Sequence, residues 1–122
     1  MILVDTSVWI NHLRSNDQNL VHLLNKNQVL CHPFVRGELA LGNFKQHKTI
    51  LTALDNLPQA VVAFTDEVHY FIEEHALFGA GIGLIDVHLI VSAKLADHTQ
   101  ILTYDKRLMS VATRFNLCAP TN

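Results

Sequence analysis

The chain has 122 residues, of which 49% are hydrophobic and 16% charged, a composition that fits one globular domain spanning residues 1–122. A domain of this size folds without a disulfide framework or a structural metal, and its low charge argues against intrinsic disorder. The net charge of −2 at pH 7 gives no electrostatic indication of nucleic-acid binding, although each bound divalent cation would raise that charge by two.

The chain alternates short apolar runs with segments of helical periodicity. The apolar runs predict buried strands at residues 2–4, 29–31, 60–63 and 101–103. The periodic segments predict helices at residues 6–14, 17–25, 33–41, 45–54, 65–77, 84–96 and 106–115. This alternation predicts an α/β fold in which a small parallel sheet is flanked by helices on both faces.

Local signals agree with these boundaries. Pro33 suits the first turn of a helix, and Thr65 is a reasonable N-cap for the helix that follows it. The three glycines between residues 78 and 83 indicate a loop. The first residues lack a basic leader and no apolar run approaches a membrane span, so neither a signal peptide nor a membrane segment is expected.

The two cysteines and the overall hydropathy bear on compartment and assembly. Cys31 and Cys118 lie in short apolar runs far apart in the sequence, which favours free thiols in a reducing cytoplasm over a disulfide. The mean hydropathy of +0.20 is high for one small core and favours an oligomeric or partner interface.

Two acidic residues directly follow predicted strands. Asp5 follows the first strand, and Asp105 follows the strand at 101–103. In open α/β sheets, ligands bind outside the carboxyl ends of the strands, so these two carboxylates are candidates for a shared site. Each also precedes a predicted helix, where Asp is a favoured N-cap, and that simpler interpretation is the stronger one for either residue alone.

Two further acids lie within predicted helices. Glu38 has uncharged and mostly apolar neighbours three and four positions away, which predicts a carboxylate on a core-facing stripe. The competing interpretation is a buried pair with an Arg from another element. Asp86 lies in the first turn of an almost wholly apolar helix, where the helix dipole alone could favour it.

Together the four acids indicate more than separate caps. Carboxylates that converge in one cleft repel one another and need a counter-charge. A set of Asp and Glu without His or Cys favours Mg²⁺ or Mn²⁺ over Zn²⁺, and these cations suit phosphoester chemistry. No HExxH motif or paired Cys spacing indicates a zinc site.

The same residues resemble a known family. The segments VDTSVWI with Asp5, GELALG with Glu38, GIGLIDVHLIVSA with Asp86 and LTYDKRL with Asp105 look like the PIN-domain ribonucleases, specifically the VapC-type toxins of toxin-antitoxin pairs. Each motif alone is weak. Their order and intervals over essentially the whole chain make the resemblance specific.

The resemblance implies a Mg²⁺- or Mn²⁺-dependent endoribonuclease of the cytoplasm, often a homodimer, which a cognate antitoxin protein inhibits. Asp5 and Asp86 would be the principal metal ligands, Glu38 would complete the set or orient water, and Asp105 would be the fourth acid. The hydroxyls of Thr6, Ser7 and Thr103 match positions beside the acids, where helix caps explain them nearly as well.

Other residues carry weaker signals. His88 lies two positions from Asp86 and is expected to pack rather than act as a base. Lys106 and Arg107 lie near the expected cleft, either as RNA phosphate contacts or as solvated helix residues. Trp9 is expected in the core, and the apolar residues of 45–54 are a candidate surface for an antitoxin helix.

Two other functions are weighed against the nuclease. A haloacid-dehalogenase-like phosphatase would use the Asp after the first strand as its nucleophile, but it requires a second Asp two residues later, where this chain has Ser7. A non-catalytic module of an antitoxin–DNA complex would not need the acidic quartet.

Overall fold

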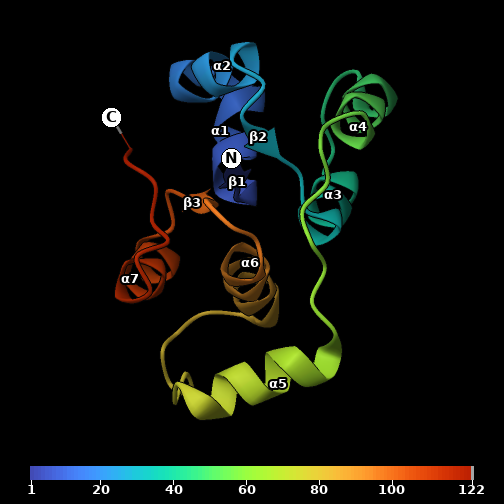
Figure 1. Ribbon diagram of the computed structural model, residues 1–122. Helices are drawn as coiled ribbons and strands as arrows, with labels where there is room; N and C mark the ends of the chain where they lie inside the picture. The colour runs from blue at the N-terminus through green and yellow to red at the C-terminus, as the bar shows by residue number, and fades with distance from the viewer. Residues whose placement is uncertain (122) are drawn as a thin grey trace.

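Three short parallel strands form the sheet at the centre of the molecule (Figure 1), whose computed structural model describes residues 1–121. Strands β1 (Ile2–Val4), β2 (Val29–Leu30) and β3 (Gln100–Leu102) pair in the order β2-β1-β3, with Leu3 opposite Leu30 on one side and Ile101 on the other. The strands are apolar because both faces of the sheet are covered, as the parallel arrangement predicts.

Seven helices surround this sheet within residues 1–121. They are α1 (Thr6–Ser15), α2 (Gln18–Asn25), α3 (Pro33–Ala40), α4 (His47–Asp55), α5 (Thr65–Glu74), α6 (Leu84–Leu95) and α7 (Lys106–Arg114). In Figure 1, α1 and α2 lie on one side of the strands, whereas α6 lies on the other with α5 packed beyond it. The predicted α/β architecture is confirmed, and every predicted helix is present.

Helix α6 is the most buried element, as its composition predicts. A continuous run of seven residues from Val87 to Ala93 is buried, and the helix packs between β3 and α5. A helix that is apolar nearly all round needs cover on every side. Its first turn, which holds Asp86, is therefore fixed at one end of a rigid core element.

The predicted strand at residues 60–63 is wrong. Cys31 N–H donates to the Pro58 carbonyl and Ala60 N–H donates to the Cys31 carbonyl, each at 2.9 Å, and the pairing stops there. The chain after Cys31 turns into α3 at Pro33, so no extended neighbour remains for the residues that follow. The two valines of this run are half exposed, at 47% and 46%, and do not join the core.

The start of α5 also differs from the prediction. Thr65 is the first helical residue, and Phe64 occupies the N-cap position. The carboxylate of Glu67 accepts the Phe64 N–H at 2.8 Å, so the residue three positions into the helix closes its end. That backward contact explains why the helix begins one position earlier than the hydroxyl suggests.

Both cysteines are free, as predicted, with Cys31 buried and Cys118 partly buried. Burial raises the pKa of the Cys31 thiol to about 11. This thiol therefore stays protonated at neutral pH and acts as a small apolar side chain. Within residues 1–121, no helix is both long enough and apolar enough to cross a membrane.

Candidate active site

The candidate site lies where the strands end and the helices begin. The backbone N–H of Asp5 donates to the Leu102 carbonyl at 2.9 Å, which places Asp5 beside the last residue of β3. From here β1 continues into α1, and β3 continues through Thr103 toward α7. This is the edge at which open parallel sheets bind their ligands.

Asp5 is held by hydroxyl groups on both strands' extensions. Its Oδ2 accepts hydrogen bonds from Ser7 Oγ at 2.7 Å and from Thr103 Oγ1 at 2.8 Å, and a longer one of 3.4 Å from Ser7 N. The residue is 6% exposed and is also the N-cap of α1. The helix cap and the site position thus coincide in one carboxylate.

Asp105 is the N-cap of α7 and shares a neighbour with Asp5. Its Oδ1 accepts from the backbone N–H groups of Arg107 at 2.9 Å and Leu108 at 3.1 Å. Its own N–H donates to Thr103 Oγ1 at 3.0 Å. The fully buried Thr103 hydroxyl therefore connects the two acids that follow β1 and β3.

Glu38 does not lie on a core-facing stripe, and this expectation is wrong. The side chain is exposed, and its Oε1 accepts a hydrogen bond of 2.6 Å from Thr6 Oγ1. Its apolar neighbours Phe34 and Leu41 are themselves 36% and 90% exposed. Both side chains are exposed, so their apolar character does not mark the buried side of α3. The contact with Thr6 nevertheless brings Glu38 to the first turn of α1, beside Asp5.

Asp86 lies at the start of α6, where its Oδ2 accepts the Gly83 N–H at 3.2 Å. Burial raises the pKa of Asp86 above its ordinary value, and the bond from Gly83 opposes this rise. The pKa is raised further by the negative charges of the other three acids, Asp5, Asp105 and Glu38. The other three predicted acids, each from a separate segment, therefore lie within electrostatic reach of Asp86.

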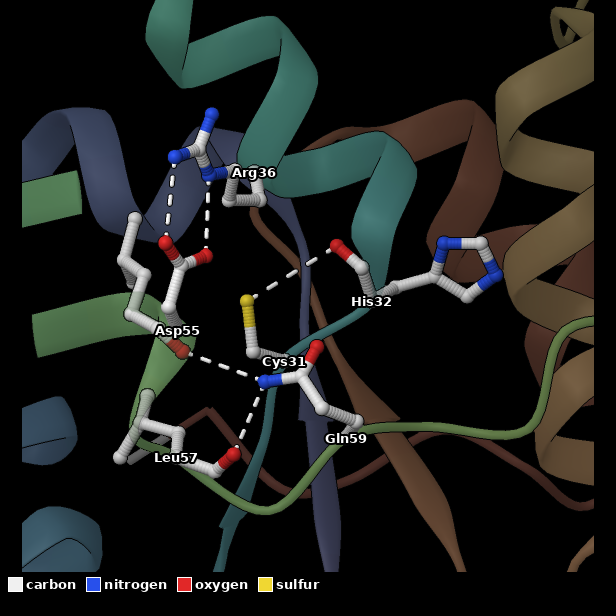
Figure 2. Close-up of polar contacts among 7 residues, drawn as sticks. Cys31, His32, Arg36, Asp55, Leu57 and Gln59 are labelled. Carbon is white, nitrogen blue, oxygen red and sulfur yellow. Dashed lines mark hydrogen bonds and ion pairs between the residues drawn. The ribbon is translucent and has the colours of Figure 1, made fainter. Parts of the chain in front are cut away.

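No basic side chain neutralises these acids within residues 1–121. The one ion pair in that part of the chain joins Arg36 Nε to Asp55 Oδ1 at 3.0 Å. Figure 2 shows the Arg36 guanidinium facing Asp55 with two contacts, from α3 to α4. The competing interpretation, an Arg partner for Glu38, is therefore wrong.

Each acid offers one oxygen that the described chain leaves free. Within residues 1–121, hydrogen bonds engage one oxygen of every carboxylate, namely Asp5 Oδ2, Glu38 Oε1, Asp86 Oδ2 and Asp105 Oδ1. The second oxygens are hard, negatively charged donors of the kind that Mg²⁺ and Mn²⁺ prefer. In the same residues, no group of three or more His, Cys, Asp or Glu side chains lies close enough together to hold a metal ion.

The glycine loop and Arg107 flank this group of acids. The Arg107 guanidinium lies against Gly81, with Nη1 at 3.5 Å from the Gly81 carbonyl. Gly81 has a φ of +81°, and a Cβ there would lie 3.0 Å from Arg107 Cδ. Arg107 thus packs on the loop that leads into the Asp86 helix, whereas its neighbour Lys106 is an exposed residue of α7.

His88 packs, as predicted, and a second histidine joins it. His88 is 6% exposed, and its ring contacts Phe34 at a centroid distance of 4.6 Å. The fully buried His32 lies 6.4 Å from it, and His32 Nδ1 accepts the Phe34 N–H at 3.0 Å to cap α3. Burial and the neighbouring His88 lower the pKa of His32 to about 4, so this cap is neutral at physiological pH.

The predictions for Trp9 and for residues 45–54 have different outcomes. Trp9 is 5% exposed and belongs to the core, as predicted. Leu51 and Leu54 of α4 are also core residues, at 8% and 2% exposure, which removes them from any partner surface. Ile50 is the third apolar residue of the candidate antitoxin surface at 45–54, and it is partly exposed.

Sequence reasoning missed one pair beside the acids. The hydroxyl of Tyr104 donates to Asp17 Oδ2 at 2.6 Å, and Tyr104 N–H donates to Ser7 Oγ at 3.0 Å. Asp17 is 5% exposed and also caps α2 through Leu20 N–H at 2.9 Å. Only the position of Tyr104 between Thr103 and Asp105 could have pointed to it.

Comparison with known proteins agrees with this geometry. Residues 2–113 match the PIN domain, and the chain belongs to that family. Two relatives, both called Ribonuclease VapC32 and both from Mycobacterium tuberculosis, come from strains CDC 1551 / Oshkosh and ATCC 25618 / H37Rv. Each is 47% identical over 108 residues, which cover 88% of this chain and 87% of the relative. The resemblance to VapC-type PIN domains is confirmed.

Proposed function

We propose that this protein is a divalent-metal-dependent endoribonuclease and the toxin of a toxin-antitoxin pair. The observation that carries the proposal is the convergence of Asp5, Glu38, Asp86 and Asp105. Burial raises the pKa of Asp86, the negative charges of the other three acids raise it further, and no cation of the described chain pairs with them. The relatives named Ribonuclease VapC32 support RNA as the substrate.

The four acids and the groups that hydrogen-bond them have different roles at this site. Thr103 and Ser7 hold Asp5 by bonds to Oδ2, which leaves Oδ1 available to a ligand on a carboxylate that is already fixed. Asp86 and Asp105 are fixed by backbone N–H groups at the starts of α6 and α7. Glu38, which like Asp105 is exposed, is suited to accept a hydrogen bond from an attacking water.

The free oxygens of these four acids would hold Mg²⁺ or Mn²⁺. When bound, the cation supplies positive charge that offsets the carboxylates and the phosphodiester and makes water more acidic. Without a cation, the acidic group repels an RNA phosphate. The charge of the site therefore gives a reason for metal dependence, and PIN-family membership favours this nuclease over a haloacid-dehalogenase-like phosphatase.

The remaining parts of the proposal concern partners and location. The antitoxin is expected to be co-expressed and to block the acidic edge, and the active toxin is expected to be a homodimer in the cytoplasm. A neighbouring open reading frame whose product copurifies with this chain and inhibits it would support the pairing. An RNA-cleavage assay distinguishes the nuclease from a non-catalytic partner module.

The test uses the purified, partner-free protein and a structured RNA with single-stranded loops. Cleavage is expected with Mg²⁺ or Mn²⁺, and loss of cleavage is expected when EDTA is in excess. Asp5→Asn should lower the rate at least about 1000-fold, because it removes a charged oxygen while retaining the cap. Asp97→Asn is the matched control and should cleave normally, because Asp97 is an exposed acid just after the C-terminal end of α6, opposite the end that holds Asp86.

Circular dichroism of both variants checks that the fold is unchanged. Cleavage by Asp5→Asn at the wild-type rate would refute the site. Absence of metal-dependent cleavage by the wild-type protein would refute the nuclease and favour the non-catalytic module.

A further inference from the structure

The Tyr104 ring lies at the acidic edge with its orientation fixed at both ends. Its backbone N–H is bonded to Ser7 Oγ at 3.0 Å, and its hydroxyl is bonded to Asp17 Oδ2 at 2.6 Å. Asn11 Nδ2 donates to the same Asp17 oxygen at 2.8 Å. Because Asn11 lies one turn after Ser7 in α1, the side chain of Tyr104 runs along α1 from its first turn.

The Tyr104 hydroxyl is hydrogen-bonded within the protein, but the side chain remains partly exposed. Tyr104 is 37% exposed although it lies between the buried Thr103 and the site acid Asp105. None of the aromatic contacts within residues 1–121 includes its ring. Burial and the Asp17 carboxylate raise the pKa of Tyr104 to about 12, so its hydroxyl remains a donor at working pH.

A fixed aromatic ring at the rim of a phosphodiester site is suited to one kind of ligand. Unpaired nucleobases stack on exposed aromatic faces, and the contact tolerates any base because every base has a π face. A ring whose rotation is already restricted loses little further entropy when a base stacks on it. Its position next to Asp105 limits the stacked nucleotide to one close to the bond that is cut.

We propose that Tyr104 is a stacking platform for an unpaired RNA base adjacent to the cleaved phosphodiester, held in place by Asp17 and Ser7. This subsite rests on the proposed ribonuclease function. It gives a physical reason for selection of single-stranded or loop RNA, since a base within a duplex has no free face to offer. The ring binds substrate, and Asp17 is a positioning residue.

The test pairs protein variants with modified RNA. After the cleavage site of the wild-type protein is mapped, oligonucleotides are made with one abasic nucleotide at each position near that site. The wild-type protein should show a rise in KM of about 5- to 100-fold for an abasic residue at one position, with little change in kcat. Tyr104→Leu should show the same rise with the unmodified RNA and no further rise with that abasic RNA.

Three further variants separate stacking from a general structural effect. Tyr104→Phe keeps the ring and should change KM only about two- to threefold. If Tyr104 acted only through its hydroxyl, Phe would raise KM as much as Leu does. Asp17→Asn should raise KM no more than Tyr104→Phe does, because the ring remains and the Asn oxygen can still accept a hydrogen bond from the Tyr104 hydroxyl. Tyr70→Leu, the same substitution at the other tyrosine, which is 68% exposed on α5, should behave like wild type.

The outcomes distinguish this proposal from the function beneath it. If the Tyr104→Leu variant retains the wild-type penalty for the abasic nucleotide, or if no abasic position matters to the wild-type protein, stacking is refuted while the nuclease stands. If Tyr104→Leu leaves RNA kinetics unchanged but weakens antitoxin binding, the ring is a protein contact and the proposal is wrong. Absence of any RNA cleavage refutes the function itself and the subsite with it. If Tyr104→Leu fails to fold, the abasic series decides with the wild-type protein and Tyr104→Phe: both should show the rise in KM at the same position, and absence of such a position refutes stacking.

Discussion

The two halves of the acidic site are built differently. Asp5 and Asp105 directly follow strands of the same sheet and share the buried hydroxyl of Thr103. Glu38 and Asp86 lie on separate helices, and within residues 1–121 each has one hydrogen bond, from Thr6 and from Gly83. The sheet half is therefore preorganised by several short bonds, whereas the helix half depends on how α3 and α6 pack.

This difference suggests a division between precision and adaptability. In the sheet half, the bond from Thr103 to Asp5 is buried, whereas the two bonds that hold the Asp105 carboxylate are partly buried and exposed. In the helix half, Glu38 is exposed and accepts a single hydrogen bond, and Asp86 follows a loop with three glycines, so both side chains are held by fewer contacts than Asp5 and Asp105. Variants that disturb one half at a time test this comparison.

The largest expected effect is in the helix half, at Asp86. Asp86→Asn should reduce RNA cleavage at least about 1000-fold, since it removes a central charge of the site. The same variant should be more stable than wild type at pH 7. The pKa of Asp86 is raised in the folded protein, so ionisation of this group opposes folding once the pH exceeds its unfolded value.

Thermal unfolding across pH checks the stability part of this prediction. The gain in Tm should be full at neutral pH and should vanish well below the ordinary pKa of 3.8, where wild-type Asp86 is protonated in both states. Asn retains an oxygen for the Gly83 N–H, which keeps the helix cap comparable. A lower Tm for Asp86→Asn at pH 7 would contradict the electrostatic description of the site.

The next effect compares the two halves directly through their threonines. Thr103→Val removes a fully buried hydroxyl that bonds Asp5 and Asp105, and should cost about 1–3 kcal/mol of stability and about 10- to 100-fold in activity. Thr6→Val removes the Glu38 contact, which is exposed, and should change stability by less than about 0.5 kcal/mol.

Urea unfolding and steady-state cleavage rates measure both variants. A thermodynamic cost at Thr6 as large as that at Thr103 would mean that the helix half is as tightly fixed as the sheet half. In that case the exposed bond to Glu38 and the buried bonds to Asp5 and Asp105 would contribute equally to stability.

The positions of three of the four acids follow from the sequence. Asp5 and Asp105 could be placed because a residue that directly follows a parallel strand must lie at one edge of the sheet. Asp86 could be placed because its helix is apolar nearly all round, which requires burial. In both cases, local pattern determines position.

The errors arose where the position depends on tertiary neighbours. Glu38 was expected to face the core because Phe34 and Leu41 are apolar, yet both are exposed. The run at 60–63 is apolar enough for a strand, but the adjacent chain turns into α3 and offers no pairing edge. The bond between Tyr104 and Asp17 joins residues far apart in the sequence, and no spacing rule relates them.

The smallest expected effect concerns the loop that leads to Asp86. Gly81 has a φ of +81°, and a Cβ added there would lie 3.0 Å from Arg107 Cδ, whereas Gly79 has a φ of +77° and no atom within 4 Å of an added Cβ. Both alanine variants should lose about 1–2 kcal/mol because the backbone conformation is unfavourable for an L side chain. Gly81→Ala should in addition displace Arg107 or the loop and slow cleavage a few-fold, roughly the effect of a small misplacement at the site.

Combining Gly81→Ala with Arg107→Ala removes the steric conflict. Cleavage rates relative to Arg107→Ala alone should then show no further loss. Equal activity losses in Gly79→Ala and Gly81→Ala would indicate that Arg107 has no part in holding the helix half of the site.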